Sequence, residues 1–358
     1  MNQPPFHAAI LAGGRGTRFW PASRRRRPKQ LLPVVGEGSL LRQTVDRLSP
    51  LVPPERIWIF ANKLLRPQVR RQVPEIPTRQ ILAEPVQRNT GPAIGLAAKL
   101  IAEQDPEAVM GVFPSDHLIA EGGAFLEILR QAAQAAEQQS LVVLGLAPQY
   151  PETGYGYIEF PEGTRPGQDP ARVVSFREKP DRETAEGYLR SGNFCWNSGM
   201  FVWRAQTVSD TIARFMPRTA EALRGLPPLG SRRFAKALAE RYPLCDDLSI
   251  DYGVLEKAEN LIGIPCRDIG WNDVGSWDAA YQLGHKDGEG NVVRTAVELL
   301  GARGNYVDAP GKLTALVGVE DLIVVDTKDA LLICPRGQAQ QVSGLVKALE
   351  KAGYDALL

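Results

Sequence analysis

Short apolar runs alternate with longer amphipathic segments over the first 150 residues, and this alternation constrains the fold more than any other feature. LVVLGL at 141–146 is apolar throughout, which is typical of a strand buried on both faces. The pattern predicts an α/β fold, with a mixed, mostly parallel sheet flanked by helices. The expected strands are 7–11, 57–61, 79–83, 108–113 and 141–146, and the expected helices are 40–48, 93–103 and 124–137.

The residue pattern of the chain changes after about residue 285. HKDGEGN reads as a polar linker, and short β-branched runs follow it, LTALVGV, LIVVD and ALLICP. An amphipathic helix is expected at 338–352. No clear short-period repeat is visible. We therefore expect a main domain at 1–284, in which 150–280 elaborates the same sheet, and a small β-rich domain at 285–358.

The charge is balanced overall but uneven along the chain. Lys plus Arg is 42 and Asp plus Glu is 41, a net charge of +1, which excludes a uniformly basic nucleic-acid coat protein. The first 36 residues hold seven basic residues and no acidic one, so the remainder carries a net −6. Either this basic segment is a solvated loop, or it meets a polyanion such as a nucleotide or nucleic acid.

Cysteine and histidine patterns indicate neither a disulfide scaffold nor a zinc site. The four cysteines contain no CxxC pair, and the three histidines lack zinc-ligand spacing. No apolar run is long enough to span a membrane, and no basic segment precedes an apolar stretch as in a secretory signal. We expect a cytoplasmic protein with no membrane partner.

Residues 11–33 read LAGGRGTRFWPASRRRRPKQLLP, a strand end followed by a glycine-rich loop. Glycines let backbone amides approach phosphates closely. The spacing matches neither the phosphate loop GxxxxGK[ST] nor the dinucleotide pattern GxGxxG. Arg18 and Lys29 add two cations to the loop, which favours a phosphate site.

This segment resembles the sugar-1-phosphate nucleotidyltransferases, and within them the mannose-1-phosphate guanylyltransferases. EPVQRNT (84–90), FPSDH (113–117), TGYGYI (153–158), SFREKP (175–180), WNSGMF (196–201), SIDYGVLEK (249–257) and WNDVGSW (271–277) match in the expected order. The resemblance implies a Rossmann-like fold of the nucleotide-diphospho-sugar transferase type. It also implies that the tail is a short left-handed β-helix-like domain, often involved in dimer contacts. The tail is too short for the isomerase barrel that some relatives carry, so one activity is expected.

The resemblance makes Arg18 and Lys29 the catalytic residues. Those expected to bind the nucleotide are Leu11, Ala12, Gly13, Gly14, Gly16, Thr17, Glu84, Arg88, Asn89, Thr90, Ser115 and Asp116. For part of this set a plainer interpretation is that Thr90 caps the next helix and the rest is loop.

Other matched segments imply the sugar-phosphate and metal sites. The residues expected to bind the sugar phosphate are Tyr155, Gly156, Glu178, Lys179 and Asn197. Asp116 follows a strand end, where open α/β sheets place ligands, and the resemblance makes Asp273 the second Mg²⁺ ligand. The alternatives are an ordinary glycine-rich hairpin, an exposed salt pair at 178–179 and a solvated acid at 116. Trp196, Phe201, Trp203, Trp271 and Trp277 are interpreted as packing residues, and His117 as structural.

The implied reaction is GTP plus mannose 1-phosphate giving GDP-mannose and pyrophosphate, with Mg²⁺ as cofactor. The partners are then the two substrates and a second copy of the chain, with no nucleic acid. Alternatives are a nucleotidyltransferase with another base or sugar, and a sensor that binds sugar nucleotide without turnover. A nucleic-acid binder built on Arg24–Arg27 ranks low, because no aromatic platforms interleave the run. The sequence offers no account of all four arginines.

Overall fold

The computed structural model describes residues 4–358, which divide into two compact units. Unit 1 comprises the chain up to Gly13, Val45–Pro114 and Ile119–Trp271, and unit 2 comprises Gly14–Thr44, Ser115–Leu118 and Asn272–Leu358. The chain passes between units within β5 (Leu118–Ile119), α1 (Leu40–Leu48) and β12 (Trp271–Asn272) and after Gly13 and Pro114. The domain boundary predicted at 284/285 stays a proposal. The expected absence of a secretory signal concerns a segment whose first three residues lie outside the described range.

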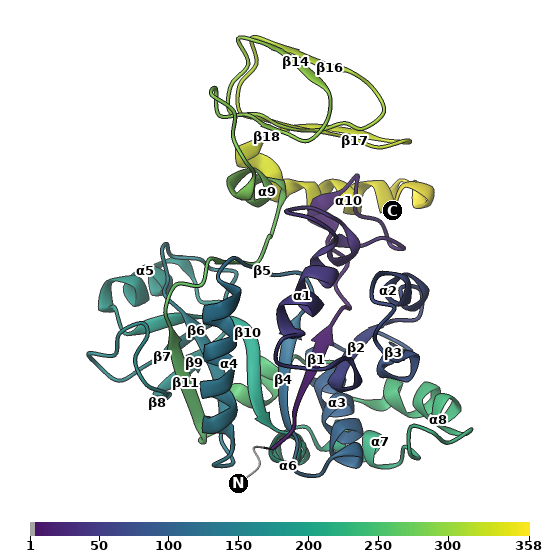
Figure 1. The fold of residues 1–358 in the computed structure, drawn as a ribbon, viewed down its shortest axis with the longest axis vertical. Helices are drawn as coiled ribbons and strands as arrows, with labels where there is room; N and C mark the ends of the chain where they lie inside the picture. Colours follow the sequence, from purple (N-terminus) through teal and green to yellow (C-terminus); the bar gives the residue numbers. More distant parts are fainter. Residues whose placement is uncertain (1–3) are drawn as a thin grey trace. The chain divides into compact units, whose positions relative to one another are not determined.

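Unit 1 is built on a ten-stranded mixed sheet (Figure 1) with the order β3–β2–β1–β4–β10–β6–β11–β8, in which β7 joins β10 and β9 joins β7. The strands are β1 (Phe6–Leu11), β2 (Ile57–Asn62), β3 (Ile81–Glu84), β4 (Val109–Pro114), β6 (Leu141–Leu146), β7 (Tyr157–Glu159), β8 (Ala171–Arg172), β9 (Ser175–Arg177), β10 (Phe194–Arg204) and β11 (Leu261–Cys266). Strands β1 to β4 pair in parallel, as do β6 and β11, whereas β10 is antiparallel to β4 and β6. The predicted mixed, mostly parallel central sheet is confirmed.

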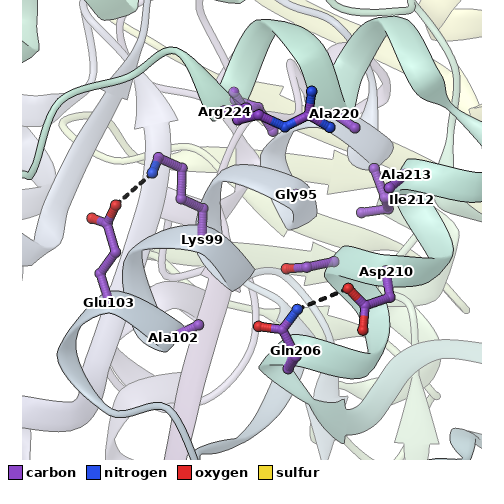
Figure 2. A pocket seen from close by; sticks show the side chains of 12 residues that line it. Gly95, Lys99, Ala102, Glu103, Gln206, Asp210, Ile212, Ala213, Ala220 and Arg224 are labelled. Atoms are coloured by element: carbon purple, nitrogen blue, oxygen red, sulfur yellow. Dashed lines mark hydrogen bonds and ion pairs between the residues drawn. The ribbon is translucent and has the colours of Figure 1, made fainter.

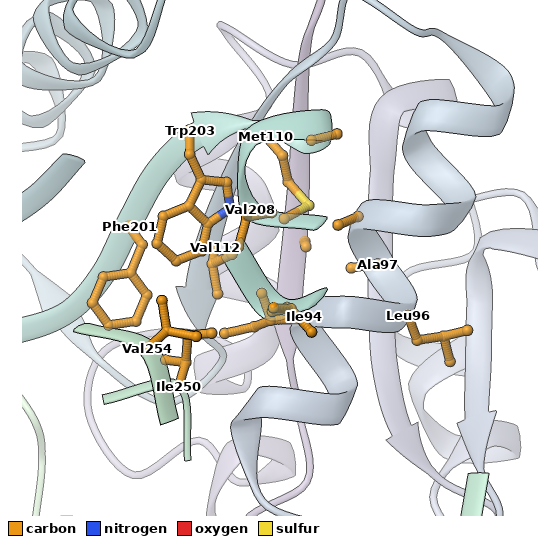
Figure 3. Packing of buried hydrophobic residues seen from close by; sticks show 14 of the residues in the cluster. Ile94, Leu96, Ala97, Met110, Val112, Phe201, Trp203, Val208, Ile250 and Val254 are labelled. Atoms are coloured by element: carbon orange, nitrogen blue, oxygen red, sulfur yellow. The ribbon is translucent and has the colours of Figure 1, made fainter. Parts of the chain in front are cut away.

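Helices cover both faces of this sheet, which explains why β4 is apolar throughout. Met110 and Val112 join a core with α3 (Thr90–Gln104) and α6 (Ala205–Phe215), as Figure 3 shows. The next residue, Phe113, points the other way, and its ring lies 6.1 Å from that of Phe125 in α4 (Gly122–Ala136). Successive strand residues face opposite sides, so a strand between two helical layers needs apolar residues at every position.

Apart from short 3-10 helices, the remaining helices of unit 1 are α2 (Arg66–Gln72), α5 (Arg182–Ser191), α7 (Pro217–Arg224), α8 (Phe234–Arg241) and a π-helix at Asp251–Leu255. Between residues 150 and 280 the sequence predicts helices at 184–190, 208–215, 233–241 and 252–258. The structure adds α2 and α7, which the sequence does not predict, and the last predicted helix is this π-helix. The predicted helix at 40–48 matches α1, and Ser39 Oγ accepts a hydrogen bond from the Arg42 amide at 3.1 Å, a typical N-cap contact. No helix within residues 4–358 has the length and apolarity to cross a membrane.

The C-terminal part of unit 2 is a short β coil (Figure 1). Strands β13 (Val292–Val293), β15 (Tyr306–Asp308) and β17 (Leu322–Asp326) stack in parallel, as do β14 (Val297–Leu300) and β16 (Thr314–Val317). β18 (Leu331–Pro335) closes the coil antiparallel to β17. Buried Asn305 Nδ2 donates to Asn291 Oδ1 of the preceding turn at 3.0 Å. The expected β-helix-like C-terminal domain is confirmed.

Two α-helices, a 3-10 helix and a segment from the N-terminal end complete the core of unit 2. α9 (Trp277–Leu283) precedes the coil, while a 3-10 helix at Arg336–Gln341 and α10 (Val342–Lys351) follow it, where one helix was expected. One buried cluster joins residues of the loop after β1 and of the first turn of α1 to residues of α9 and of the tail: Phe19, Trp20, Leu32, Val34, Leu40, Trp277, Tyr306, Ile323 and Val346. The glycine-rich loop and the β coil therefore share a core.

Candidate functional site

Lys29 lies at the centre of a polar cluster in unit 2. Its ammonium is 2.8 Å from Asp116 Oδ2 and donates to the carbonyl oxygens of Asp273 at 2.7 Å and Val274 at 3.0 Å. The Lys29 side chain is 7% exposed. Three segments singled out in the sequence, the glycine-rich loop, FPSDH and WNDVGSW, therefore meet at one buried ammonium group.

The Asp116 carboxylate is stabilised in its charged form. Burial by itself would raise its pKa, but the Lys29 ammonium and the neighbouring His117 outweigh burial, and the pKa falls below its usual value. An ionised carboxylate at this position can bind a cation or an ammonium group.

The Asp273 carboxylate and the Arg18 guanidinium both lie close to the α-carbon of Gly275, where a side chain would otherwise stand. A Cβ at Gly275 would lie 2.9 Å from Asp273 Oδ2 and 3.4 Å from Arg18 Nη1. Within residues 4–358 no group of three or more Asp, Glu, His or Cys side chains could hold a metal. Mg²⁺ often takes only one or two carboxylates and completes its shell with water and phosphate oxygens. The pair Asp116 and Asp273 fits that donor set.

The glycine-rich loop has one position that requires glycine. Gly16 has φ +59°, and a Cβ there would lie 2.4 Å from Lys29 Cβ. Ser23 Oγ donates to the Gly16 carbonyl at 2.8 Å and fixes this turn, while Thr17 begins a 3-10 helix that ends at Phe19. At Gly14 a Cβ would meet no atom within 4 Å. Lys29 therefore packs against the backbone of the loop at Gly16. Gly14, the second glycine of the loop, has free space where a side chain would be.

A second group of predicted residues gathers in unit 1 at the carboxyl ends of β1 and β3. Gln87 Nε2 donates to the Gly13 carbonyl at 2.8 Å, and Glu84 Oε1 is 3.7 Å from where a Gly13 Cβ would stand. The Tyr242 hydroxyl donates to Glu84 Oε2 at 2.7 Å. Burial raises the pKa of Glu84, although the bond from Tyr242 opposes it. Sequence reasoning missed Gln87 and Tyr242; Gln87 lies within EPVQRNT, but nothing marked Tyr242.

The rest of EPVQRNT is tied to residues 243–250. Arg88 donates to the Pro243 carbonyl at 2.7 Å, and Asn89 Nδ2 to Asp247 Oδ1 at 2.8 Å. Thr90 is the first residue of α3, and its hydroxyl accepts from the Ile250 amide at 2.9 Å instead of capping the helix. These contacts hold the loop in place. Leu11 and Ala12 precede Gly13 at the end of β1, and Ser115 is the first residue of unit 2 after β4.

The predicted sugar-phosphate residues come together in unit 1. The backbone N–H of Asn197 donates to the Gly156 carbonyl at 2.7 Å, and the backbone N–H of Lys179 donates to the Tyr155 carbonyl at 3.2 Å. Lys179 Nζ lies 3.2 Å from Glu178 Oε1. A Cβ at Gly156 would lie 2.3 Å from Glu178 Oε2. The hairpin thus depends on its glycine to admit the carboxylate.

One oxygen of this cluster has no hydrogen-bond partner among residues 4–358. Glu178 Oε2 is buried and makes no hydrogen bond within the described part of the chain. Burial and the nearby Asp251 raise the pKa of Glu178, and burial raises that of Asp251. Asn197 Nδ2 donates to Asp251 Oδ1 at 3.0 Å. Asp251, at the start of the π-helix, was not predicted as a site residue, although its SIDYGVLEK segment was noted.

Aromatic residues of the matched motifs pack around these groups. The Tyr155 ring lies 5.4 Å from Trp196 and 5.5 Å from Trp271. Trp196, Phe201, Trp203 and Trp277 are buried, as their interpretation as packing residues requires.

A separate groove of about 450 Å³ lies in unit 1 between α3, α6 and α7 (Figure 2). It contains none of the predicted site residues. Two polar pairs along it lie within single helices, Lys99 with Glu103 and Gln206 with Asp210. The predicted site residues instead form three separate clusters, one around Lys29 in unit 2 and two around Glu84 and Glu178 in unit 1.

Comparison with known proteins defines the class. Residues 7–290 match the family model "Nucleotidyl transferase", and residues 295–349 match "MannoseP isomerase/GMP-like beta-helix domain". The chain belongs to the nucleotidyl transferase family and is a transferase enzyme with a β-helix-like C-terminal domain.

Particular relatives carry more specific names. The chain is 40% identical to "Xanthan biosynthesis protein XanB" of Xanthomonas campestris over 96% of its length and 73% of the relative's. It is 38% identical to "Mannose-1-phosphate guanylyltransferase" of Escherichia coli over the same shares. A solved structure titled "mannose-1-phosphate geranyltransferase", from Thermus thermophilus, matches with a TM-score of 0.84 and 37% identity, covering 96% of this chain and 99% of that one.

Proposed function

We propose that this enzyme transfers GMP from GTP to mannose 1-phosphate, giving GDP-mannose and pyrophosphate. The observation that carries the proposal is the Lys29 cluster, in which one ammonium joins the glycine-rich loop, Asp116 and the backbone of Asp273. Such a cluster suits a phosphate chain and a hard cation. The name of the Escherichia coli relative supports the choice of substrates.

In the proposed reaction an oxygen of the sugar phosphate attacks the α-phosphorus of GTP. The new P–O bond forms as the bond from the α-phosphorus to the bridging oxygen breaks, and pyrophosphate leaves on the opposite side. A phosphate monoester has a second pKa of about 6, so the nucleophile is already ionised at neutral pH and needs no general base. Arg18 and Lys29 then stabilise negative charge on the reacting phosphates, and the amides from Gly13 to Thr17 orient the triphosphate.

Asp116 and Asp273 would hold Mg²⁺ in this scheme. When bound, the ion supplies positive charge that neutralises phosphate oxygens. We expect Asp273→Asn to raise the Mg²⁺ concentration needed for half-maximal rate, because one anionic ligand is lost. Thermal unfolding without metal should stay close to wild type, because the Lys29 contact uses the Asp273 backbone carbonyl, which the substitution keeps. An unchanged Mg²⁺ titration would remove Asp273 from the metal site.

The two clusters of unit 1 would recognise the base and the sugar. Glu84, Arg88, Asn89 and Thr90 would line the nucleotide site. Leu11, Ala12 and Ser115, which are adjacent in sequence to the phosphate-binding segments, would also contact the nucleotide. Tyr155, Gly156, Glu178, Lys179 and Asn197 would bind mannose 1-phosphate. The unpartnered Glu178 oxygen supports this assignment, because a sugar hydroxyl can donate the hydrogen bond that the protein leaves unmade.

A pyrophosphate-release assay tests the function directly. It crosses GTP, ATP, dTTP, CTP and UTP with mannose 1-phosphate and glucose 1-phosphate. We expect turnover to be highest with GTP and mannose 1-phosphate. A strong preference for another pair would overturn the proposed specificity, and inactivity with every pair would favour a sensor of sugar nucleotides.

Lys29→Ala tests the cluster that carries the proposal. We expect turnover to fall by about 10²–10³, the usual loss for one preorganised charge-stabilising group. Lys99→Ala, at a lysine of α3 outside the site, is the matched control and should leave turnover near wild type. Wild-type turnover in Lys29→Ala would exclude Lys29 from the mechanism.

We further propose that the enzyme works in the cytoplasm as a homodimer formed through its C-terminal domain. Leu300, Val317, Leu331 and Ile333 are exposed on β14, β16 and β18, and exposed apolar groups of this kind mark interfaces. Light scattering should give twice the chain mass for wild type. It should give a lower mass for Leu300→Asp with Ile333→Asp, whereas a monomeric wild type would contradict the dimer.

A further inference from the structure

The arginine run after the glycine-rich loop is held by the C-terminal segment. Arg24 Nη2 lies 2.9 Å from Asp329 Oδ1. Arg25 reaches two carboxylates, Glu350 Oε1 at 2.6 Å and Asp355 Oδ1 at 2.9 Å. Two of the four arginines that the sequence left unexplained are therefore bound by acids more than 300 residues further along the chain.

The same segment also reaches the loop itself. Glu350 Oε1, besides its bond with Arg25, lies 3.5 Å from Arg15 Nη2. Arg18 Nη1 donates to Gln340 Oε1 at 2.8 Å. Trp20, which is buried, donates from Nε1 to the Leu357 carbonyl at 2.8 Å. The contacts come from the 3-10 helix before α10, from α10 and from the last residues of the chain.

Each exposed ion pair by itself contributes little to the stability of the folded chain. Together with the buried Trp20 and the shared core, however, they restrict one short loop from several directions. The group that meets Arg18 is a neutral amide, so it orients the guanidinium without offsetting its charge. Arg18 Nη1 also lies near Gly275 and Asp273, so the bond to Gln340 holds it beside the Lys29 cluster.

We propose that the C-terminal segment is part of the phosphate-binding apparatus, in which Gln340 is a positioning residue for Arg18 and Glu350 is one for Arg15 and Arg25. This rests on the proposed function, in which Arg18 stabilises charge on the phosphates. The Arg18 guanidinium keeps its full charge and is already oriented before the reaction. Little side-chain entropy is therefore lost when GTP binds.

The test is a double-mutant cycle on the full-length chain with Gln340→Leu and Arg18→Ala. Gln340→Leu should lower kcat about tenfold, the typical loss of one hydrogen bond to a charged group, with an unchanged thermal midpoint. Gln340→Glu keeps an acceptor oxygen but adds a negative charge that offsets the guanidinium, so it should recover only part of the rate. Gln338→Leu, at an exposed glutamine of the same 3-10 helix, is the control. In the Arg18→Ala background, Gln340→Leu should have no further effect, because the group that it positions is gone.

Equal losses in both backgrounds, or wild-type kcat in Gln340→Leu, would overturn the proposal. Should Gln340→Leu lower the thermal midpoint, Glu350→Gln decides instead, and it should weaken GTP binding measured by calorimetry. Unaltered GTP affinity in Glu350→Gln would then count against the proposal. Inactivity of the wild type with every substrate pair contradicts the proposed function separately. In that case calorimetry still tests the positioning. It measures the effect of Gln340→Leu on GTP affinity in the wild-type and in the Arg18→Ala backgrounds.

Discussion

Two glycines, one in the Lys29 cluster of unit 2 and one in the Glu178 cluster of unit 1, occupy positions where any side chain would displace a charged group. Gly16 lies against Lys29, and Gly156 lies against Glu178. Both were predicted as site residues for a different reason, namely that glycine opens the backbone to a ligand. In the structure they also make room for the protein's own ammonium and carboxylate. Their substitution therefore tests the positions of those two groups.

Gly16→Ala should be damaging in two ways. The left-handed backbone costs an alanine about 1–2 kcal/mol, and the new Cβ would lie 2.4 Å from Lys29 Cβ. We expect a lower thermal midpoint and a fall in kcat of about 10²-fold, because Lys29 must move. Gly14→Ala is the matched control for stability, since its Cβ meets no atom within 4 Å. Equal thermal midpoints in the two variants would contradict this account.

Gly156→Ala should act on the sugar phosphate and leave the nucleotide unaffected. The new Cβ would stand 2.3 Å from Glu178 Oε2 and displace the carboxylate. We expect KM for mannose 1-phosphate to rise about 10- to 100-fold, as when a hydrogen bond to a charged group is lost, with KM for GTP unchanged. Gly187→Ala, in α5 with no atom within 4 Å, is the control. A rise in KM for GTP of similar size would show a general disturbance instead.

At the scale of elements, β1 and β2 share a buried polar contact whose state depends on pH. His7 Nδ1 accepts a hydrogen bond from Trp58 Nε1 at 3.2 Å. An accepting nitrogen belongs to a neutral imidazole. Burial lowers the pKa of His7 from 6.5 to about 4, although Asp105 opposes the shift. The folded chain therefore keeps His7 uncharged where the unfolded chain protonates it.

This shift predicts a loss of stability in mild acid. Below pH 6.5 the unfolded chain takes up a proton at His7, and the folded chain does so only near pH 4. The free energy of unfolding should therefore fall as pH decreases, by about 2–3 kcal/mol between pH 7.5 and 4.5. Urea unfolding at both values measures it. His7→Gln keeps an acceptor for Trp58 and should show a smaller fall, whereas equal falls would contradict the prediction.

At the scale of the whole molecule, the tail and the glycine-rich loop depend on one core. Phe19, Trp20 and Leu32 are buried among residues of the tail such as Tyr306 and Val346. The last 70 or so residues are therefore more than an appended module, since they bury apolar side chains of the loop that carries Arg18.

Removing the tail should unfold part of the loop. In a fragment of residues 1–284, Phe19, Trp20 and Leu32 lose their apolar neighbours from the tail. We expect the fragment to aggregate or to bind a dye for exposed apolar surface, because burying each such side chain stabilises by about 1.5–3 kcal/mol. Full-length protein is the control. A soluble fragment that unfolds cooperatively at the wild-type midpoint would instead support an independent domain at 1–284.

Much of the fold was predictable because its signals are local. Continuous apolar runs marked β4 and β6, and the periodic segment at 40–48 matched α1. α2 was missed because RPQVRRQ has one buried apolar residue, Val69, and thus no visible period. The β coil shows no regular repeat because its turns differ in length, with contacts between successive turns 14 and then 17 residues apart.

The sequence by itself determined the class of fold and the motifs that mark the family, because strand periodicity, glycine positions and motif order are properties of short segments. Only the tertiary structure decided which groups meet. It brought Lys29 to Asp116 and Asp273, Tyr242 to Glu84, and Asp251 to Asn197. It also gave Arg24 and Arg25 partners in the tail. Contacts between residues hundreds of positions apart depend on how the elements pack, and no local pattern carries that information.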